Sequence, residues 1–217
     1  MKVVIIDYGM GNLFSVRRAV EVGGATDIEV SADPARLAVA DRVILPGVGA
    51  FVDGMAGLNR AGFVPAIRDY VAAGRPLLGI CLGMQMLMDQ SEEFGQTPGL
   101  GLIPGQVRAI DRDRGNHPRR KLPSIGWAAL SPESPWQGTP LANTEPGAAV
   151  YFLHSFHAVP ETPADLLASY DYDGTRVTAA VRRGAVTGAQ FHPEKSGPVG
   201  LGIMATFLAQ NTPVAAG

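Results

Sequence analysis

The chain has 217 residues, of which 46% are apolar and 18% are charged, and its net charge is −2. The length and composition predict one globular domain over residues 1–217, and the near-neutral charge argues against a nucleic-acid-binding surface. The apolar run near the start is too short for a signal peptide, no segment reaches the ~20 apolar residues of a membrane span, and a lone cysteine favours a reducing, cytoplasmic location without disulfides.

The first half of the chain predicts strands that alternate with helices. A β-branched run at 2–6 predicts a strand buried on both faces, a turn follows at 8–12, and apolar residues at helical spacing predict a helix that ends at Gly23. Further strands are expected at 28–30, 42–45 and 76–79, with helices from Asp33-Pro34, over 63–73, and from Met84 to about Gln90. This alternation predicts a parallel sheet with helices on both faces.

The second half predicts antiparallel strands that extend this sheet. Asp173-Gly174 and Arg183-Gly184 are typical of hairpin turns. Strands are expected at 106–110, 127–130, 149–156, 177–182 and 185–191, a closing helix at 198–210, and a frayed tail at 211–217. The predicted fold is a single-domain, doubly wound α/β fold with a mostly parallel sheet and added antiparallel strands in the C-terminal half.

Six basic residues lie between positions 108 and 121, where Asp111 and Asp113 dilute their charge. Gly115 and Pro118 indicate a loop, so we expect a solvated loop in preference to a docking or phosphate-steering surface.

The only cysteine lies between two glycines in the segment Gly79-Ile80-Cys81-Leu82-Gly83. A buried strand, a very tight turn and a helix with this pattern place the central side chain above the sheet edge, at the start of the helix. The helix dipole and nearby amides favour a thiolate there. Cys81 is therefore a candidate nucleophile; the alternative is a buried structural cysteine beside two packing glycines.

A general base for this nucleophile is expected in the segment Phe191-His192-Pro193-Glu194. His192 follows a predicted strand, and Pro193 redirects the chain. Glu194 can reach the far ring nitrogen of His192 and stabilise the imidazolium. The alternative for His192 alone is a strand-end residue bonded to backbone.

Acyl transfer by a cysteine also needs hydrogen-bond donors for an oxyanion. The backbone N–H of Leu82, directly after the cysteine, is one candidate. The loop Pro46-Gly47-Val48-Gly49 is a candidate for the second, because glycine permits positive φ and close backbone approach. The alternative is a phosphate-binding loop, although the lysine of that pattern is missing.

The other histidines are weaker candidates for a base. His117 lies in the basic loop, and neither His154 nor His157 has a carboxylate two residues away. Four histidines and one cysteine show no recognised zinc spacing, so neither a metal nor a cofactor is expected.

Taken together, these segments resemble the class I (triad) glutamine amidotransferases, which have a flavodoxin-like fold. The resemblance rests on Gly79-Ile80-Cys81-Leu82-Gly83-Met84-Gln85, Phe191-His192-Pro193-Glu194 and Pro46-Gly47-Val48-Gly49-Ala50-Phe51. Three motifs narrow it to the glutaminase subunits of imidazole glycerol phosphate synthases, which act in histidine biosynthesis. These motifs are Asp7-Tyr8-Gly9-Met10-Gly11-Asn12-Leu13, the loop at 46–51 and His192-Pro193-Glu194-Lys195-Ser196. The resemblance runs from residue 3 to about residue 208.

The resemblance implies that Cys81 attacks the side-chain carboxamide of glutamine. His192 would take the thiol proton and protonate the departing ammonia, Glu194 would orient His192, and water would release glutamate. The implied oxyanion donors are Leu82, Val48 and Gly49, and the implied glutamine pocket contains Gly47, Gly49, Leu82, Gln85, Glu93, Ser155 and Phe156. Glu93, expected after the elbow helix, is suited to pair with the substrate α-ammonium; the alternative is a solvated charge at a helix end.

The resemblance also implies a heterodimer with a (β/α)8 barrel synthase subunit that receives the ammonia. That subunit would make imidazole glycerol phosphate and an aminoimidazole carboxamide ribonucleotide. The loop at 46–49 could couple the two sites by flipping its peptides. The positions that match the docking face are Asn12, Pro123, Trp127 and Lys195. The family usually has P-H-M-G-W-N where this chain has Pro123-Ser124-Ile125-Gly126-Trp127-Ala128, so the His and Asn side chains of the family's segment, and any hydrogen bonds they make at the interface, are missing here.

Three other functions are considered. The first is a glutaminase subunit for a different synthase, against which Lys195-Ser196 and the motif at 7–13 argue. The second is a stand-alone elbow-cysteine hydrolase or peptidase, which would need no partner. The third is a silent subunit that only regulates a partner, against which an intact Cys81, His192 and Glu194 argue.

Overall fold

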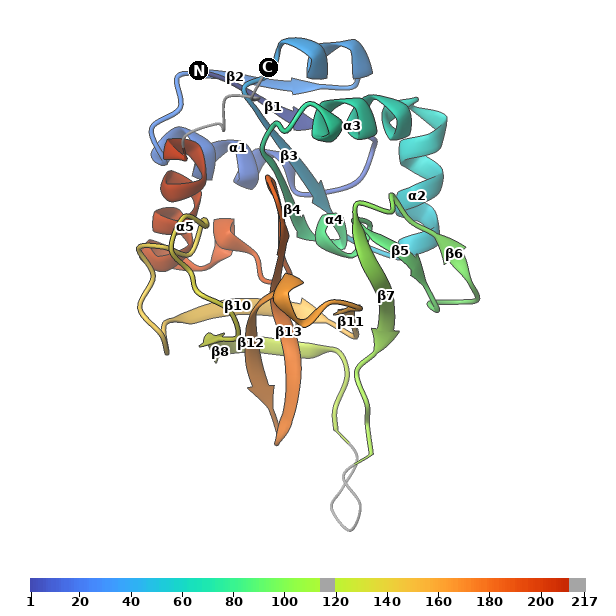
Figure 1. Ribbon diagram of the computed structural model, residues 1–217, viewed down its shortest axis with the longest axis vertical. Coiled ribbons are helices and arrows are strands. Elements are labelled where there is room, and N and C mark those ends of the chain that lie inside the picture. The colour runs from blue at the N-terminus through green and yellow to red at the C-terminus, as the bar shows by residue number, and fades with distance from the viewer. Residues whose placement is uncertain (114–119, 211–217) are drawn as a thin grey trace.

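The structure is a computed structural model that describes residues 1–113 and 120–210 (Figure 1). The predicted frayed tail at 211–217 lies outside the described residues, as do Arg114, His117 and Arg119 of the basic loop. The prediction of a single domain stays a prediction.

The central sheet has eight strands, and five neighbouring ones are parallel in the order β2-β1-β3-β4-β14. Read as 2-1-3-4-5, this is the flavodoxin-like strand order. Three antiparallel strands, β13, β12 and β9, extend the sheet beyond β14. The bounds are β1 Lys2–Ile6, β2 Asp27–Ser31, β3 Arg42–Gly47, β4 Leu77–Cys81, β9 Ser131–Pro132, β12 Leu166–Tyr172, β13 Thr175–Arg183 and β14 Val186–Ala189.

Helices cover both faces of the parallel strands (Figure 1). Because successive side chains alternate across a strand, Val3 and Ile5 pack in one core cluster with residues of α1 (Leu13–Val22) and α5 (Gly197–Ala209). Val4 and Ile6 pack in the other cluster with residues of η1, α2 and α3. Both faces of β1 are thus buried, which explains its continuous apolar run. The second set of helices is η1 Pro34–Val39, α2 Phe51–Arg60 and α3 Phe63–Ala72.

Two smaller sheets lie beside the central one. An antiparallel ribbon pairs β8 with β10, and a four-stranded sheet has the order β11-β7-β5-β6. The bounds are β5 Met88–Ser91, β6 Thr97–Pro98, β7 Ile103–Ala109, β8 Ser124–Ala129, β10 Ala149–His154 and β11 Phe156–Pro160, with short helical turns α4 Leu82–Gln85, η2 Pro163–Asp165 and η3 Pro193–Lys195. The predicted α/β class with added antiparallel strands is confirmed.

The predicted helix from Met84 to about Gln90 is wrong: α4 is one turn, and the chain continues as β5. The carbonyls of Met86, Leu87 and Met88 accept hydrogen bonds from the N–H groups of residues 100–103. Those carbonyls are therefore unavailable to the i+4 amides that a longer helix would need. The predicted strand at 149–156 is also divided, because the chain leaves β10 at Ser155 and pairs next with β7.

Arg120 departs from the solvated loop that the basic stretch predicts. Its buried guanidinium donates to the carbonyl oxygens of Tyr172 (3.1 Å), Asp173 (3.0 Å) and Asp111 (2.9 Å). Arg120 thus ties the loop to the β12–β13 turn.

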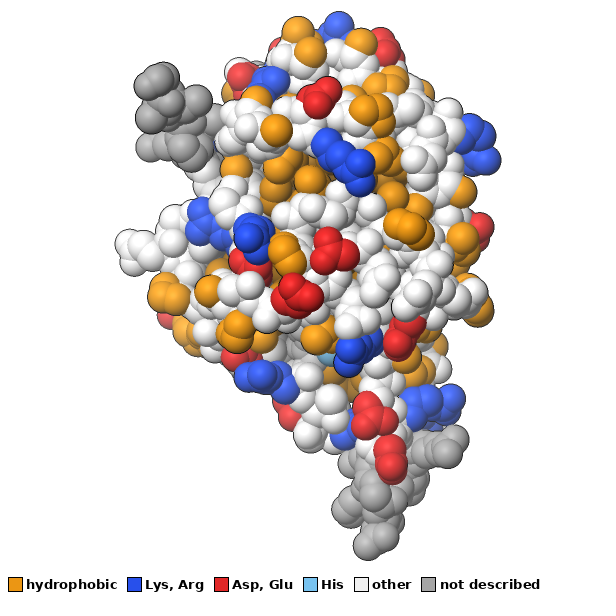
Figure 2. Space-filling model, turned by 45° about the vertical axis from the view of Figure 1, so that its right-hand side comes forward, with side chains coloured by type: hydrophobic (Ala, Val, Ile, Leu, Met, Phe, Trp, Pro, Cys, Tyr) orange, Lys and Arg blue, Asp and Glu red, His pale blue; other side chains and the backbone are white. Residues whose placement is uncertain are grey.

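Charges of both signs are interspersed on the face shown in Figure 2. Within the two described ranges, no helix is long and apolar enough to cross a membrane.

Candidate active site

Three strands bring the predicted site together at one edge of the sheet. The main chain of Gly47 at the end of β3 is the register partner of Cys81 at the end of β4. On the other side of β4, Ala189 of β14 pairs with Ile80, and His192 follows three residues later. The carboxyl ends of parallel strands are where open α/β sheets bind ligands.

The elbow at Cys81 depends on its two glycines. Cys81 has φ 54° and ψ −110°, a conformation that L-residues adopt only under constraint. A Cβ at Gly79 would lie 2.7 Å from the carbonyl oxygen of Gly83, and a Cβ at Gly83 would lie 1.9 Å from that of Leu45. Only glycine fits at these two positions, so the sequence pattern reflects real steric limits.

His192 and Glu194 form a buried pair, of which His192 lines the pocket. His192 Nδ1 lies 2.8 Å from Glu194 Oε1, and both side chains are almost fully buried. Burial lowers the pKa of His192, but the Cys81 sulfur and the Glu194 carboxylate outweigh that effect and raise the pKa to about 9. The arrangement therefore favours the charged form of the His192 ring.

A pocket of about 230 Å³ lies over these groups. The structure brings eleven of the predicted residues to its wall: Val48, Gly49, Cys81, Leu82, Gln85, Glu93, Pro123, Ser155, Phe156, His192 and Lys195. Four predicted residues do not line the pocket: Gly47, Glu194, Asn12 and Trp127. Asn12 accepts a hydrogen bond from the Ser15 N–H (3.2 Å) as the N-cap of α1, and Trp127 is 58% exposed on the ribbon.

Two glycines of the segment at 46–49 are required, one by its packing and the other by its backbone conformation. A Cβ at Gly47 would lie 2.6 Å from the Tyr8 hydroxyl and 2.9 Å from Leu82 Cβ. The Tyr8 hydroxyl donates to the Pro46 carbonyl (3.0 Å), which fixes the first peptide of this segment. Residue 49 has φ 96°, a backbone conformation that favours glycine.

Glu93 follows the strand β5, not a helix, and it is not a solvated charge. Its Oε2 accepts the N–H of Phe51 at 2.7 Å. Phe51 opens α2, whose own N-cap residue, Ala50, has no side-chain oxygen to offer. Glu93 therefore caps the helix that follows the loop at 46–49 while it also lines the pocket.

Sequence reasoning missed three contributors to the site. Leu153 and His154 line the pocket, and the Cys81 sulfur lies 4.0 Å from the Leu153 carbonyl oxygen. Gln190 is fully buried, and its Nε2 lies 3.8 Å from the same sulfur. Gln190 could have been noticed as a polar residue inside the apolar run before His192. Leu153 and His154 could not, because their positions at the pocket depend on the end of β10 before Ser155.

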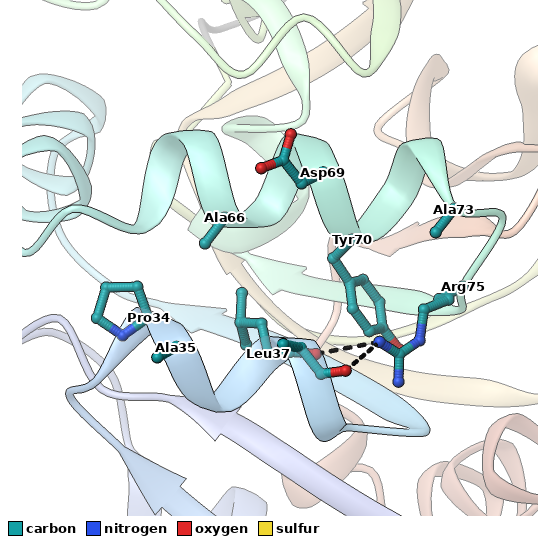
Figure 3. Close-up of a pocket in the computed structure, with 9 residues that line it drawn as sticks. Pro34, Ala35, Leu37, Ala66, Asp69, Tyr70, Ala73 and Arg75 are labelled. Atoms are coloured by element: carbon teal, nitrogen blue, oxygen red, sulfur yellow. Dashed lines mark hydrogen bonds between the residues drawn. The ribbon is translucent and has the colours of Figure 1, made fainter.

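Another cavity, of about 310 Å³, lies between η1 and α3 (Figure 3). Its Arg75 donates to the carbonyls of Leu37 and Ala38 and lies over the Tyr70 ring. The lining residues include neither cysteine nor histidine. No group of three or more His, Cys, Asp or Glu side chains in the described part of the chain is arranged to hold a metal ion.

Comparison with known proteins identifies the family of the chain. The model of the family "Glutamine amidotransferase class-I" matches residues 4–210. The chain is 46% identical over 209 residues to "Imidazole glycerol phosphate synthase subunit HisH 1" of Legionella pneumophila (strain Lens), covering 95% of this chain and 98% of the relative. It is 47% identical over 205 residues to the HisH subunit of Lacticaseibacillus casei (strain BL23), covering 94% of each.

Solved structures agree at the level of the fold. "Structure of PurLQS from Thermotoga maritima" superposes with a TM-score of 0.69 at 21% identity, covering 95% of this chain and 97% of that one. "Crystal structure of glutamine amidotransferase" gives 0.67 at 18% identity, covering 94% and 98%. The family model and the two HisH relatives together span the loop, the elbow and the His192–Glu194 pair. The chain therefore belongs to the class-I glutamine amidotransferases, among the HisH subunits of imidazole glycerol phosphate synthase.

Proposed function

We propose that this chain is the glutaminase subunit of an imidazole glycerol phosphate synthase, with Cys81, His192 and Glu194 as its catalytic triad. One observation carries the assignment of the triad. Cys81, in its constrained conformation, lies in the same pocket as His192, whose ring is paired at 2.8 Å with the buried carboxylate of Glu194.

The proposed reaction follows from these contacts. His192 takes the thiol proton, and the Cys81 thiolate attacks the carboxamide carbon of glutamine. Backbone N–H groups of Leu82 and of the loop residues Val48 and Gly49 stabilise the oxyanion. The imidazolium then protonates the departing nitrogen, so ammonia leaves and a glutamyl thioester remains. Water, deprotonated by His192, cleaves the thioester to glutamate and restores the thiol.

The remaining pocket residues would hold the rest of the substrate. Glu93 offers a carboxylate to the α-ammonium of glutamine, while Gln85, Ser155 and Phe156 present polar and backbone groups along the wall. Gly47 contributes by letting the loop approach the elbow.

The partner would be a barrel-type synthase subunit that receives the ammonia in a heterodimer. The ribbon of β8 and β10 supports this docking site, because Ile125, Trp127 and Leu153 are exposed on it. Asn12, Pro123 and Lys195 would complete the contact. The lone cysteine supports a cytoplasmic location.

Glutamate production by the chain, with and without the barrel subunit and its nucleotide ligand, tests the proposal. We expect little glutamate from the chain alone and a large increase in the ligand-bound complex. Acceleration by a different synthase would assign the chain to another amidotransferase, and peptide turnover by the chain alone would indicate a hydrolase. Unimpaired glutamine-dependent synthesis by Cys81→Ala would indicate a silent subunit.

A further inference from the structure

Gln190 places a buried amide beside the candidate nucleophile. Its side chain is fully buried, its Nε2 lies 3.8 Å from Cys81 Sγ, and its Oε1 lies 3.1 Å from Gln85 Nε2. A thiolate accepts hydrogen bonds, so an N–H held at the sulfur favours the charged form over the thiol.

A backbone carbonyl decides which end of this amide faces the sulfur. Gln85 Nε2 donates to the Phe156 carbonyl oxygen at 2.9 Å, and a carbonyl can only accept. The second hydrogen of that Nε2 points to Gln190, which must therefore present its oxygen there. The Gln190 NH2 group is left facing Cys81, and the opposite orientation would set donor against donor.

The same carbonyl is held by a second row of hydrogen bonds. His154 Nδ1 lies 2.8 Å from the Phe156 oxygen, and His154 Nε2 lies 2.8 Å from the Tyr170 hydroxyl. Burial lowers the pKa of His154 to about 4, so the ring is neutral. Its single proton lies on Nδ1, because the Phe156 carbonyl that faces Nδ1 can only accept. Tyr170 must then donate to Nε2, and Ser124, 3.0 Å from the Tyr170 oxygen, must donate to Tyr170.

We propose that Gln190 is a positioning residue that donates a hydrogen bond to the Cys81 thiolate, and that the row Ser124–Tyr170–His154 fixes the carbonyl on which its orientation depends. The inference rests on the proposed function, because it concerns the same nucleophile. Ser124 stands where the family usually has histidine, and its hydroxyl begins the row. Ser124 and Tyr170 also line a cavity of about 280 Å³ beside Trp127, on the proposed docking ribbon.

Alkylation of Cys81 by iodoacetamide, followed against pH in the isolated chain, tests the proposal without glutamine or a partner. Gln190→Met keeps a similar volume and removes the donor. We expect the pH of half-maximal alkylation to rise by about half to one unit, because one hydrogen bond to the charged form is lost. Gln190→Glu should raise it further, since a negative charge replaces the donor.

Tyr170→Phe provides a second variant that leaves Gln190 in place. It should move the profile in the same direction by a smaller amount. Tyr172→Phe is its matched control: Tyr172 lies on the same strand, but its hydroxyl donates to the Lys121 carbonyl, outside the row, so its profile should match the wild type. The other groups near the sulfur, His192, Glu93, His154, Lys195 and Tyr8, are unchanged in all of these variants.

A merely structural role would lower the melting temperature of Gln190→Met and Tyr170→Phe and leave both profiles at the wild-type position. That result would overturn the inference, as would equal shifts in Tyr170→Phe and Tyr172→Phe. Should Gln190→Met not fold, the two tyrosine variants decide. A wild-type chain that alkylates as expected and never makes glutamate would instead overturn the proposed function.

Discussion

Gly47 and Cys81 are direct partners across β3 and β4, so the glycine-rich loop and the nucleophile share one packed piece of backbone. The space between them is filled by the Tyr8 hydroxyl, the Leu82 side chain and the Gly83 main chain, which lie 2.6, 2.9 and 3.0 Å from where a Cβ of residue 47 would be. Any side chain at this position must push the loop away from the elbow.

Gly47→Ala should therefore lower kcat for glutamine by about 10- to 100-fold, because the oxyanion donors lose their alignment. Gly202→Ala is the control, since a Cβ there meets nothing within 4 Å and α5 should gain slightly in helix propensity. Steady-state kinetics and thermal unfolding of both variants check this. Equal kcat in the two variants would show that the close approach does not matter for the reaction.

Stability should depend on pH through His192. The pKa of His192 is raised from 6.5 to about 9 in the folded chain, so its stabilising contribution is complete below pH 6.5 and is lost as the pH rises through 9. Relative to His192→Gln, we expect the free energy of unfolding to fall by about 2 to 3 kcal/mol over that interval. Urea titrations at several pH values measure it. If the free energy of unfolding changed with pH by the same amount in both proteins, the coupling of His192 to Cys81 and Glu194 would be contradicted.

Glu93 has two separable roles, one at the pocket and one at the start of α2. Glu93→Gln keeps an oxygen for the Phe51 N–H but loses the charge, so KM for glutamine should rise about tenfold or more with little loss of stability. Glu93→Ala should in addition lose about 1 kcal/mol of stability with the helix cap. Kinetics and chemical denaturation of the pair separate these effects. An unchanged KM in both would remove Glu93 from the glutamine pocket.

Trp127 should act in docking without contributing to the stability of the chain. It is 58% exposed and forms a T-shaped pair with Tyr151, with ring centroids 6.1 Å apart. Trp127→Ala should weaken binding of the barrel subunit by about tenfold or more and change the free energy of unfolding by less than about 0.5 kcal/mol. Val39→Ala, an exposed apolar change on η1, should leave binding unchanged. Titration calorimetry measures the affinity of each variant for the barrel subunit. Equal affinities for Trp127→Ala and Val39→Ala would place the interface elsewhere.

The fold could be predicted where local pattern and tertiary context agree. The hairpin turn at Asp173-Gly174 has positive φ at both residues, as its composition requires. Helix α2 was not predicted because Gly54 and Gly57 weaken its propensity. The packing explains them: a Cβ at Gly54 would lie 2.8 Å from Met86 Sδ, and one at Gly57 would lie 2.9 Å from the Tyr8 ring.

The site could be predicted where single residues carry the chemistry. The motifs predicted that Cys81 and His192 would meet and that Glu194 would pair with His192, and the structure places the first two in one pocket with Glu194 bonded to His192. Tyr170 could not be found in this way, and Gln190 was marked only as a polar residue in an apolar run. Their places depend on contacts between distant segments, from Gln190 to Cys81 and Gln85 and from Tyr170 to His154. The prediction of a helix after Cys81 was wrong for the same reason, since N–H groups at 100–103 bond to the carbonyls at 86–88 that the helix would need.

The most direct test of the triad is to look for its covalent intermediate. Glu194→Gln should slow thioester hydrolysis, so the complex with the barrel subunit, mixed with glutamine and quenched in acid, should carry a glutamyl group. Intact-mass and peptide mass spectrometry locate it. The account predicts a glutamyl thioester on Cys81 that is absent from Cys81→Ser; glutamate formed at the wild-type rate by Cys81→Ser would contradict it.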